Sequence, residues 1–187
     1  MKLGIMLPWA GARLRIPVET IRLAEELGYD SLWTGEAYGS DALTPLAYVA
    51  ALTRRIRLGT SVLQLAARTP AATAMAVATL EQLAGPGRVI CGLGVSGPQI
   101  VEGWYGQPWG RPARRVRDYV AILRKVLARK EPVAHAGDEI SLPFTGPGSV
   151  GMGKPLKSIL HTNPALPVWL GTGNSDDGYG GCTNDCE

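Results

Sequence analysis

Residues 56–94 read IRLGTSVLQLAARTPAATAMAVATLEQLAGPGRVICGLG and contain one complete strand, helix and strand unit. Aliphatic and β-branched side chains over residues 56–65 predict a strand. Thr69-Pro70 is typical of a helix N-cap followed by a first-turn proline, and it predicts a helix that ends at the glycine-rich breaker 85–87. Residues 89–93 follow as another apolar strand. This order places the two strands parallel in one sheet.

The same pattern occurs on both sides of this stretch. Residues 3–7 and 31–34 predict strands, and Pro17 and Thr44-Pro45 open the helices that follow them. A fourth helix begins near Pro112. Strand and helix units thus cover residues 2–129 at a spacing of roughly thirty residues.

Beyond the fourth helix the pattern loosens. Residues 133–135 and 140–142 predict a hairpin, and residues 167–170 predict a fifth strand of the sheet. A closed β/α barrel needs about twice this number of units. The predicted fold is therefore α/β, a TIM-barrel type (β/α)8 fold of which about the first half, up to five strands, is present.

Length and composition indicate one domain. The chain has 187 residues, of which 45% are hydrophobic and 19% charged, enough for one sizeable core. We expect the barrel part to span residues 1–171. Residues 172–187 contain no aliphatic side chain and predict a disordered polar tail.

Charge and apolar length argue against nucleic-acid and membrane partners. The net charge of +3 comes from scattered arginines, and the densest group is expected to face solvent: Arg111, Arg114, Arg115 and Arg117. Residues 1–9 and 70–84 are too short or too polar for an export signal or a membrane span. The chain is expected to be soluble and cytoplasmic.

The metal-binding residue types are sparse. Cys91 lies in an apolar strand, whereas Cys182 and Cys186 lie in the polar tail. His135 and His161 fall in the irregular region and are expected to be structural or solvated. We predict no metal site and no disulfide framework.

Ligands of parallel α/β folds bind at the carboxyl ends of the strands. The residues at those ends are Trp9, Glu36, Tyr38, residues 61–64 and residues 94–99. Glu36 lies beside the apolar Trp33 and Ala37 and is a candidate for proton transfer. The alternative is a structural acceptor for loop amides or for a neighbouring arginine.

Gly92, Gly94 and Gly97 match the dinucleotide-binding pattern G-x-G-x-x-G directly after a strand. A Rossmann helix must begin at that turn, whereas the prolines and glycines of residues 98–112 are expected to delay the helix. We favour a glycine-lined floor for a flat ring over a simple turn. Three aromatic residues of the next loop either cap such a ring or pack on the rim: Trp104, Tyr105 and Trp109.

Several separated segments resemble the luciferase-like monooxygenase superfamily: LWTGEAYGSD (32–41), LGTSV (58–62) and GLGVSGPQ (92–99). Two more resemble its branch of oxidoreductases that use the deazaflavin coenzyme F420: GWYGQPWG (103–110) and GKPLKSILH (153–161). The resemblance implies a TIM barrel that transfers hydride between coenzyme F420 and a small organic substrate. An FMN-dependent monooxygenase of the same superfamily is the alternative.

The resemblance also implies roles for individual residues. A bulge with a cis non-proline peptide, at Ser61 and Val62, would support the back of the ring. Together with Trp9 at the end of the first strand, the predicted cofactor-binding set is Trp9, Ser61, Val62, Gln64, Gly94, Val95, Ser96 and Gly97. Many members of the superfamily carry a histidine after the acid of the second strand, where this chain has Ala37, so Glu36, Tyr38, substrate or water would have to handle the proton.

Length is the other departure from the superfamily, whose members continue for about four more strands. We expect a half barrel to expose the flank of its last strand and part of its apolar interior, which favours a homo-oligomer. A third hypothesis is therefore a catalytically inert, self-associating fragment.

Overall fold

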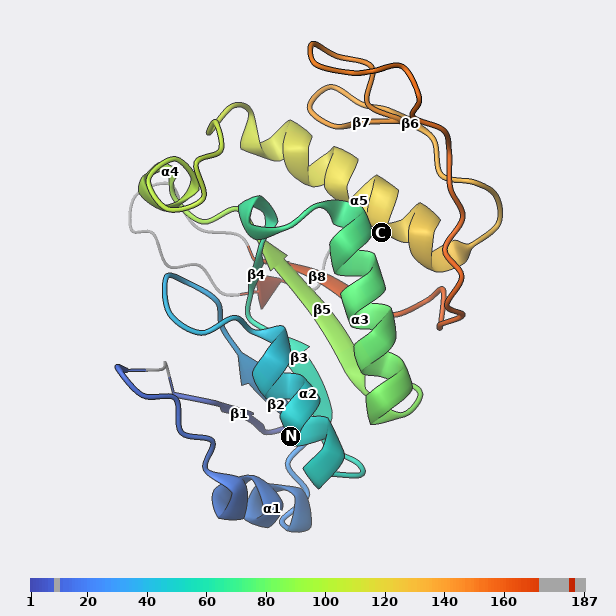
Figure 1. Ribbon diagram of the computed structural model, residues 1–187. Helices are drawn as coiled ribbons and strands as arrows, with labels where there is room; N and C mark the ends of the chain where they lie inside the picture. The colour runs from blue at the N-terminus through green and yellow to red at the C-terminus, as the bar shows by residue number, and fades with distance from the viewer. Residues whose placement is uncertain (9–10, 172–181, 184–187) are drawn as a thin grey trace.

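A computed structural model describes residues 1–8, 11–171 and the backbone of residues 182–183 (Figure 1). Its centre is a seven-stranded, mostly parallel sheet of strand order β1-β2-β3-β5-β8-β9, with β4 paired to β5. The strands are β1 (Gly4–Met6), β2 (Ser31–Thr34), β3 (Arg57–Thr60), β4 (Leu63–Gln64), β5 (Val89–Gly94), β8 (Val168–Gly171) and β9 (Cys182–Thr183). This topology confirms the predicted parallel α/β sheet and its fifth parallel unit.

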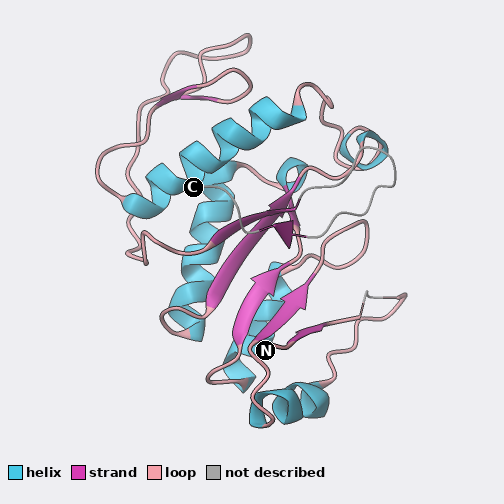
Figure 2. Ribbon diagram, turned by 180° about the vertical axis from the view of Figure 1, so that it is seen from behind, coloured by secondary structure: helices cyan, strands magenta, loops and turns pink. Residues whose placement is uncertain are grey.

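Helices cover one face of the sheet, and the view from behind shows the strands of the other face (Figure 2). The helices are α1 (Val18–Glu26), α2 (Leu43–Leu52), α3 (Pro70–Ala84) and α5 (Pro112–Ala128). Alternate strand residues such as Leu32, Leu58 and Leu93 point toward the helices and are at most 1% exposed. Burial of these aliphatic side chains is the main force that holds helices and sheet together.

The opposite face carries small residues and two indoles. Trp33 of β2 stacks on Trp169 of β8, with ring centroids 5.1 Å apart and planes inclined by 30°. A Cβ at Gly59 would overlap the Trp33 ring, so glycine lets the indole lie flat on the sheet. Indole Nε1 of Trp33 also donates to Ser31 Oγ at 2.9 Å.

The helix starts show one prediction confirmed and one wrong. Thr69 caps α3 as predicted, because its Oγ1 accepts from the backbone N–H of Ala72 at 3.2 Å. Thr44 does not cap α2. Asp41 performs that task, since its carboxylate accepts from the N–H groups of Leu43 and Thr44 at 2.9 and 2.8 Å.

The predicted continuous strand over residues 56–65 is also wrong. β3 ends at Thr60, the Ser61–Val62 peptide is cis, and β4 begins at Leu63. At the break, the Thr60 hydroxyl donates to Gly92 O at 2.8 Å and accepts from Gly92 N–H at 2.9 Å. A side chain thus replaces the backbone ladder where the chain leaves the sheet.

The segment after β5 differs from the expectation of a delayed helix. A single-turn helix, α4 (Pro98–Val101), begins directly after Gly97, and the long helix α5 follows at Pro112 as predicted. A short 3-10 helix, η1 (Leu65–Ala67), joins β4 to the start of α3.

The predicted hairpin is confirmed as β6 (His135–Ala136) and β7 (Ser141–Leu142). Its turn meets the arginines that were expected to face solvent: Arg111 and Arg114 contact Glu139 and Asp138 at 2.6 and 3.0 Å. Both side chains are exposed as expected, although the hairpin supplies carboxylates to them at the start of α5. Arg115 departs from the expectation, because its side chain is only 17% exposed and lies 3.9 Å from Glu139.

The carboxylate of Asp118 in α5 holds the hairpin through hydrogen bonds. Burial raises the pKa of its carboxyl, but hydrogen bonds from the N–H groups of Glu139 and Ile140 and from His135 outweigh this and lower it. The ring of His135 lies 3.2 Å from Asp118 Oδ1, the structural role predicted for this histidine.

The ends of the sheet differ from the expected open last strand. β9 pairs antiparallel with β8 at Leu170 and Gly171, so β8 has a neighbour on its outer side. β1 is the edge strand at the other end. The rest of the predicted disordered tail lies outside the described residues, and in the described part no helix is both long and apolar enough to span a membrane.

Arg88 is the buried charge whose loss should destabilise the fold most. The residue as a whole is 7% exposed. Its guanidinium donates to Ile56 O, Thr53 O, Thr53 Oγ1 and Ala84 O at 2.7–3.1 Å. We expect Arg88→Met to lower the free energy of unfolding by about 3 kcal/mol, because these acceptors lose their donors. Urea denaturation of the purified chain measures this loss.

The matched control is Arg22→Met, since Arg22 is half-exposed and, among the described residues, its one side-chain polar partner is Glu19 at 3.4 Å. It should change the free energy of unfolding by less than about 0.5 kcal/mol. Equal losses for the two variants would contradict this role of Arg88.

Candidate functional site

The carboxyl ends of β2, β4 and β5 meet at one edge of the sheet. β4 pairs with β5 through Leu63 with Leu93 and Gln64 with Gly94, which brings residues 61–64 beside residues 93–94. Glu36 reaches the same place from the loop after β2. The structure therefore brings together most of the residues that sequence analysis selected.

Glu36 is 6% exposed, and its carboxylate is surrounded by donors. Oε2 accepts from the backbone N–H of Gln64 at 3.0 Å, and the two oxygens accept from Arg68 Nη1 and Nη2 at 2.8 and 2.9 Å. The Gln64 side chain returns the contact by donating from Nε2 to Glu36 O at 2.7 Å. These contacts match the structural alternative for Glu36, while its predicted catalytic role stays a prediction.

Arg68 forms the other half of this ion pair. Burial lowers the pKa of its guanidinium, but the hydrogen bonds and negative charge of Glu36 outweigh burial and raise it. The hydroxyl of Tyr119 donates to Arg68 O at 3.0 Å and lies 2.6 Å from the Thr73 hydroxyl. Burial raises the pKa of Tyr119 to about 12, so this phenol remains a neutral donor.

The Ser61–Val62 bulge rests on glycine. A Cβ at Gly94 would overlap Val62 Cγ2, and a Cβ at Gly171 would lie 3.1 Å from Val62 Cγ1. Both glycines therefore leave space for the Val62 side chain. The cis peptide expected from the family resemblance is present, and Ser61 and Val62 are half-buried at the surface of the edge.

Residues 95–97 continue this surface from the end of β5. Val95 is half-buried, and Ser96 is exposed with a left-handed backbone at φ 62°. Gly97 is extended and precedes α4. Together with residues 61–64 they form what we call the backbone platform: Ser61, Val62, Leu63, Gln64, Gly94, Val95, Ser96 and Gly97.

The remaining predicted residues are less well placed or lie outside the description. Tyr38 is 70% exposed, and Trp9 lies outside the described residues. Tyr105 is half-buried, and its hydroxyl donates to Ala37 O at 3.3 Å, so the loop after α4 packs beside the loop after β2. Burial, and then the negative charge of Glu36, raise the pKa of Tyr105.

Sequence reasoning missed Arg68 and Tyr119. Arg68 follows a 3-10 turn in a loop, where an arginine is usually solvated, and Tyr119 is one of many apolar positions on α5. The one available signal was the expectation that Glu36 could accept from a neighbouring arginine. Which arginine it was depended on the tertiary fold.

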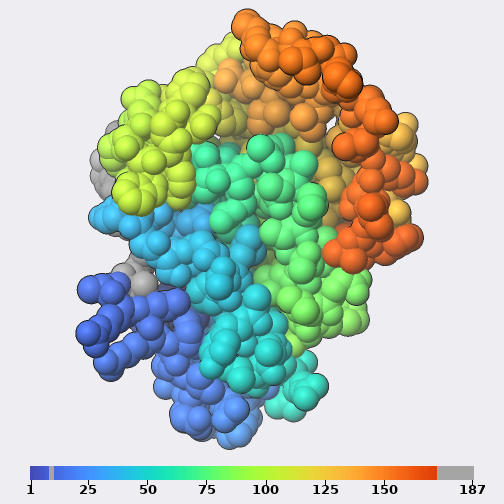
Figure 3. All heavy atoms as spheres, in the orientation of Figure 1, coloured from blue at the N-terminus to red at the C-terminus, as the bar shows by residue number. Residues whose placement is uncertain are grey.

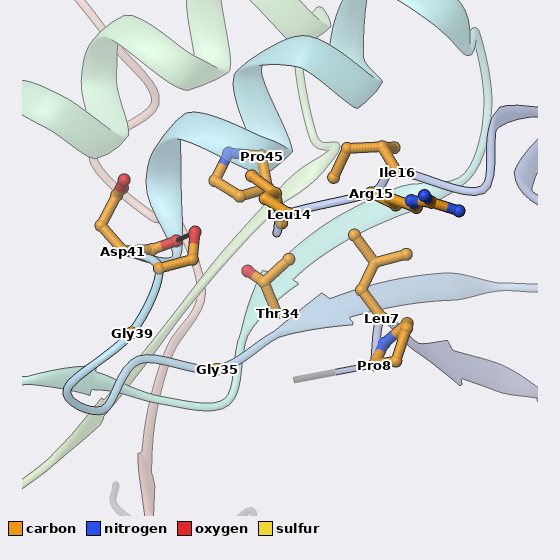
Figure 4. A pocket seen from close by; sticks show the side chains of 11 residues that line it. Leu7, Pro8, Leu14, Arg15, Ile16, Thr34, Gly35, Gly39, Asp41 and Pro45 are labelled. Atoms are coloured by element: carbon orange, nitrogen blue, oxygen red, sulfur yellow. Dashed lines mark hydrogen bonds between the residues drawn. The ribbon is translucent and has the colours of Figure 1, made fainter. Parts of the chain in front are cut away.

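Two hollows lie away from the platform. One is a pocket of about 40 Å³ on the helix side of β1 and β2, lined by Leu7, Thr34, Asp41 and Pro45 among others (Figure 4). It has room for water but not for a ring ligand. The other is an outer groove of about 840 Å³ between α3, α5 and residues 154–161.

Residues 154–161 pass over the outer surface beside α3 and α5 in Figure 3. We call this segment the strap. Polar contacts hold it in place: Gln82 Nε2 donates to His161 O at 2.8 Å, and Arg129 Nε donates to Ser158 O at 2.7 Å. Arg129 Nη1 also lies 3.0 Å from the ring of His161.

Within the described residues, no three His, Cys, Asp or Glu side chains come together as a metal site.

Comparison with known proteins gives the family. The luciferase-like monooxygenase family profile matches residues 1–179, so the chain belongs to that family. It is 53% identical over 173 residues to a Mycobacterium tuberculosis protein named "Putative coenzyme F420-dependent oxidoreductase Rv3520c", a match that covers 91% of this chain and 50% of that protein. The chain thus spans about half the length of this curated relative.

Solved structures agree on the fold. The coenzyme F420-dependent tetrahydromethanopterin reductase of Methanopyrus kandleri matches with a TM-score of 0.69 and 23% identity, over 91% of this chain and 50% of its own. The oxygenating part of 3,6-diketocamphane monooxygenase from Pseudomonas putida, in complex with FMN, matches with a TM-score of 0.68 and 20% identity, over 91% and 51%. The sheet and its helices therefore correspond to about half of a luciferase-like β/α barrel.

Close packing of Val62 on Gly94 can be tested by adding a methyl group at Gly94 and truncating the Val62 side chain. We expect Gly94→Ala to lower the free energy of unfolding by about 1–3 kcal/mol, because its Cβ overlaps Val62 Cγ2. Combining it with Val62→Ala should recover part of that loss, and chemical denaturation of the singles and the double gives the coupling.

Gly11→Ala is the control, since a Cβ at Gly11 meets nothing within 4 Å. It should leave the free energy of unfolding within about 0.5 kcal/mol of the wild type. Strict additivity of Gly94→Ala and Val62→Ala would contradict the contact.

Proposed function

We propose that this chain carries the ring-binding part of an oxidoreductase that transfers hydride between coenzyme F420 and a small organic substrate. The observation that carries the proposal is the backbone platform at the strand ends, where the half-buried Ser61–Val62 bulge, with its cis peptide, packs on Gly94 beside the exposed Ser96. The 53% identity to a protein named as an F420-dependent oxidoreductase supports the choice of cofactor.

The residues of the platform fit a flat ring with polar edges. Gly94 and Gly171 leave room for the Val62 side chain to pack closely at the bulge. Gln64 is 4% exposed, and within the described part of the chain its Oε1 is a buried acceptor without a hydrogen-bond partner. The proposed set for holding the cofactor is Trp9, Ser61, Val62, Gln64, Gly94, Val95, Ser96 and Gly97. The deazaflavin, when bound, supplies the hydride-exchanging carbon.

The chain's own residues would bind, orient and exchange a proton. The Ala37 side chain next to Glu36 is a methyl group and supplies no proton. Of the two predicted catalytic residues, Glu36 has its carboxylate engaged by Arg68 and the Gln64 N–H, whereas the exposed Tyr38 hydroxyl is accessible to a substrate. We therefore assign proton donation to Tyr38 or to water, and orientation of the platform to Glu36.

The alternative cofactor is FMN. Its isoalloxazine is also a flat tricyclic ring, so the platform accommodates it on the same grounds. The likeness to the FMN complex from Pseudomonas putida supports the fold alone, at 20% identity. Coenzyme F420 is preferred because the 53% identical relative bears that cofactor's name.

Titration of the purified chain with coenzyme F420, followed by its fluorescence, tests the proposal. We expect a saturable change at micromolar cofactor, because a preformed surface binds a rigid ring without a large ordering cost. A parallel titration with FMN distinguishes the two oxidoreductase readings. Absence of a saturable change with either compound would contradict ring binding by this chain and favour the inert fragment.

We also propose that the chain forms a homo-oligomer. Large apolar side chains are exposed around the outer groove: Met75 of α3 at 61%, and Leu156, Ile159 and Leu160 of the strap at 68%, 91% and 40%. Contiguous exposed apolar surface of this kind marks an interaction site. We propose that a second copy of the chain covers the outer groove.

Sedimentation velocity over a range of concentrations measures this self-association. The wild type should form a species larger than the monomer, and Met75→Glu should shift the equilibrium toward monomer, because it places a charge on an apolar contact. The control is Arg22→Glu, which also introduces a glutamate but lies on α1, away from the groove. A wild type that stays monomeric at high concentration would contradict the proposal.

A further inference from the structure

Two loops at the carboxyl end of the sheet and helix α5 meet at Arg68. Arg68 follows η1, its guanidinium binds Glu36 from the loop after β2, and its backbone carbonyl accepts from Tyr119 of α5. The side chain of Arg68 is 21% exposed and that of Glu36 is 4% exposed, so water reaches little of this ion pair. Arg68 is thus fixed at both its backbone and its side chain.

A chain of hydrogen bonds leads from Arg68 to the platform. Arg68 holds both carboxylate oxygens of Glu36, and Oε2 of Glu36 also holds the Gln64 N–H at 3.0 Å. The Gln64 side chain closes the circuit on Glu36 O. Gln64 is separated from the Ser61–Val62 bulge only by Leu63, and its backbone pairs with Gly94, so both halves of the platform depend on its position.

We propose that Arg68 is a positioning residue for the backbone platform: by holding the Glu36 carboxylate, it fixes the Gln64 backbone and so sets the affinity of the platform for the cofactor ring. This inference rests on the proposed function. Arg68 acts through Glu36 and is not a catalytic residue.

The physical reason is the cost of an unpaired buried carboxylate. When Arg68 is removed, Glu36 keeps one backbone donor for two oxygens, and it must either take up a proton or turn toward water. Both responses weaken its bond to the Gln64 N–H. A lysine at this position keeps the charge but replaces the two parallel guanidinium bonds by a single point contact.

A matched ion pair exists at the other end of β3. Arg57 contacts Asp30, with side chains 29% and 22% exposed, at the opposite end of the strand from the platform. Arg57→Met therefore removes a partly buried ion pair from the same sheet without touching the path from Arg68 to Gln64. It controls for general loss of stability.

The experiment compares Arg68→Met, Arg68→Lys and Arg57→Met with the wild type by two measurements. Amide hydrogen exchange followed by NMR reports on the Gln64 N–H in the chain without ligand, and F420 fluorescence titration gives the dissociation constant. We expect Arg68→Met to raise both the exchange rate of the Gln64 N–H and the dissociation constant for F420 by about tenfold. Arg68→Lys should give values between those of the wild type and Arg68→Met. Arg57→Met should change neither the exchange rate of Gln64 nor the dissociation constant, even if its melting temperature falls as far as that of Arg68→Met.

The outcomes separate the two proposals. If the wild type binds F420 and Arg68→Lys shows wild-type exchange at Gln64 and wild-type affinity, the inference is overturned and the proposed function stands. The lysine variant decides this even if Arg68→Met fails to fold. If the wild type itself binds no F420, the proposed function fails, and the role assigned to Arg68 in ring binding falls with it.

Discussion

The buried carboxylate of Glu36 is the constraint on which the candidate site depends. A charge that is 6% exposed has to be paired, and here the partners come from two other parts of the chain, the Gln64 backbone and the Arg68 guanidinium. The loop after β2 is thereby tied to β4. On the other side of the break, the Thr60 hydroxyl binds both backbone groups of Gly92. The chain between Thr60 and Gln64 is thus held at both ends by side chains.

The two faces of the sheet divide structural and functional tasks. Residues that point to the helices are large and aliphatic, and they supply the core. On the other face, Gly59 and Gly92 lie where a Cβ would meet the Trp33 ring and Thr60 O, so main chain and indoles replace aliphatic packing. The platform at the strand ends continues this glycine-rich face. The Trp33 ring fills the space over Gly59, and the Val62 side chain fills the space over Gly94.

The sequence was sufficient for features with local causes. Thr69 caps α3 because the cap lies within the same turn, and the order of strands and helices determines the parallel sheet. It was insufficient where a distant group decided the outcome. Arg111 and Arg114 meet carboxylates of a hairpin more than twenty residues away, and Glu36 pairs with Arg68, 32 residues further along the chain. The cap of α2 was missed for a local reason, because Asp41 lies only three residues before Thr44. For the site, the residues at the strand ends were predictable as a group, whereas the Arg68 partner of Glu36 required the fold.

The central claim is that a flat redox ring binds on the backbone platform, and chemical-shift mapping tests it most directly. In ¹⁵N-labelled chain titrated with coenzyme F420, the account predicts that the largest backbone shifts occur at residues 61–64 and 94–97. Saturable shifts that centre instead on the outer groove, at α3 and the strap, with residues 61–64 unchanged, would contradict it.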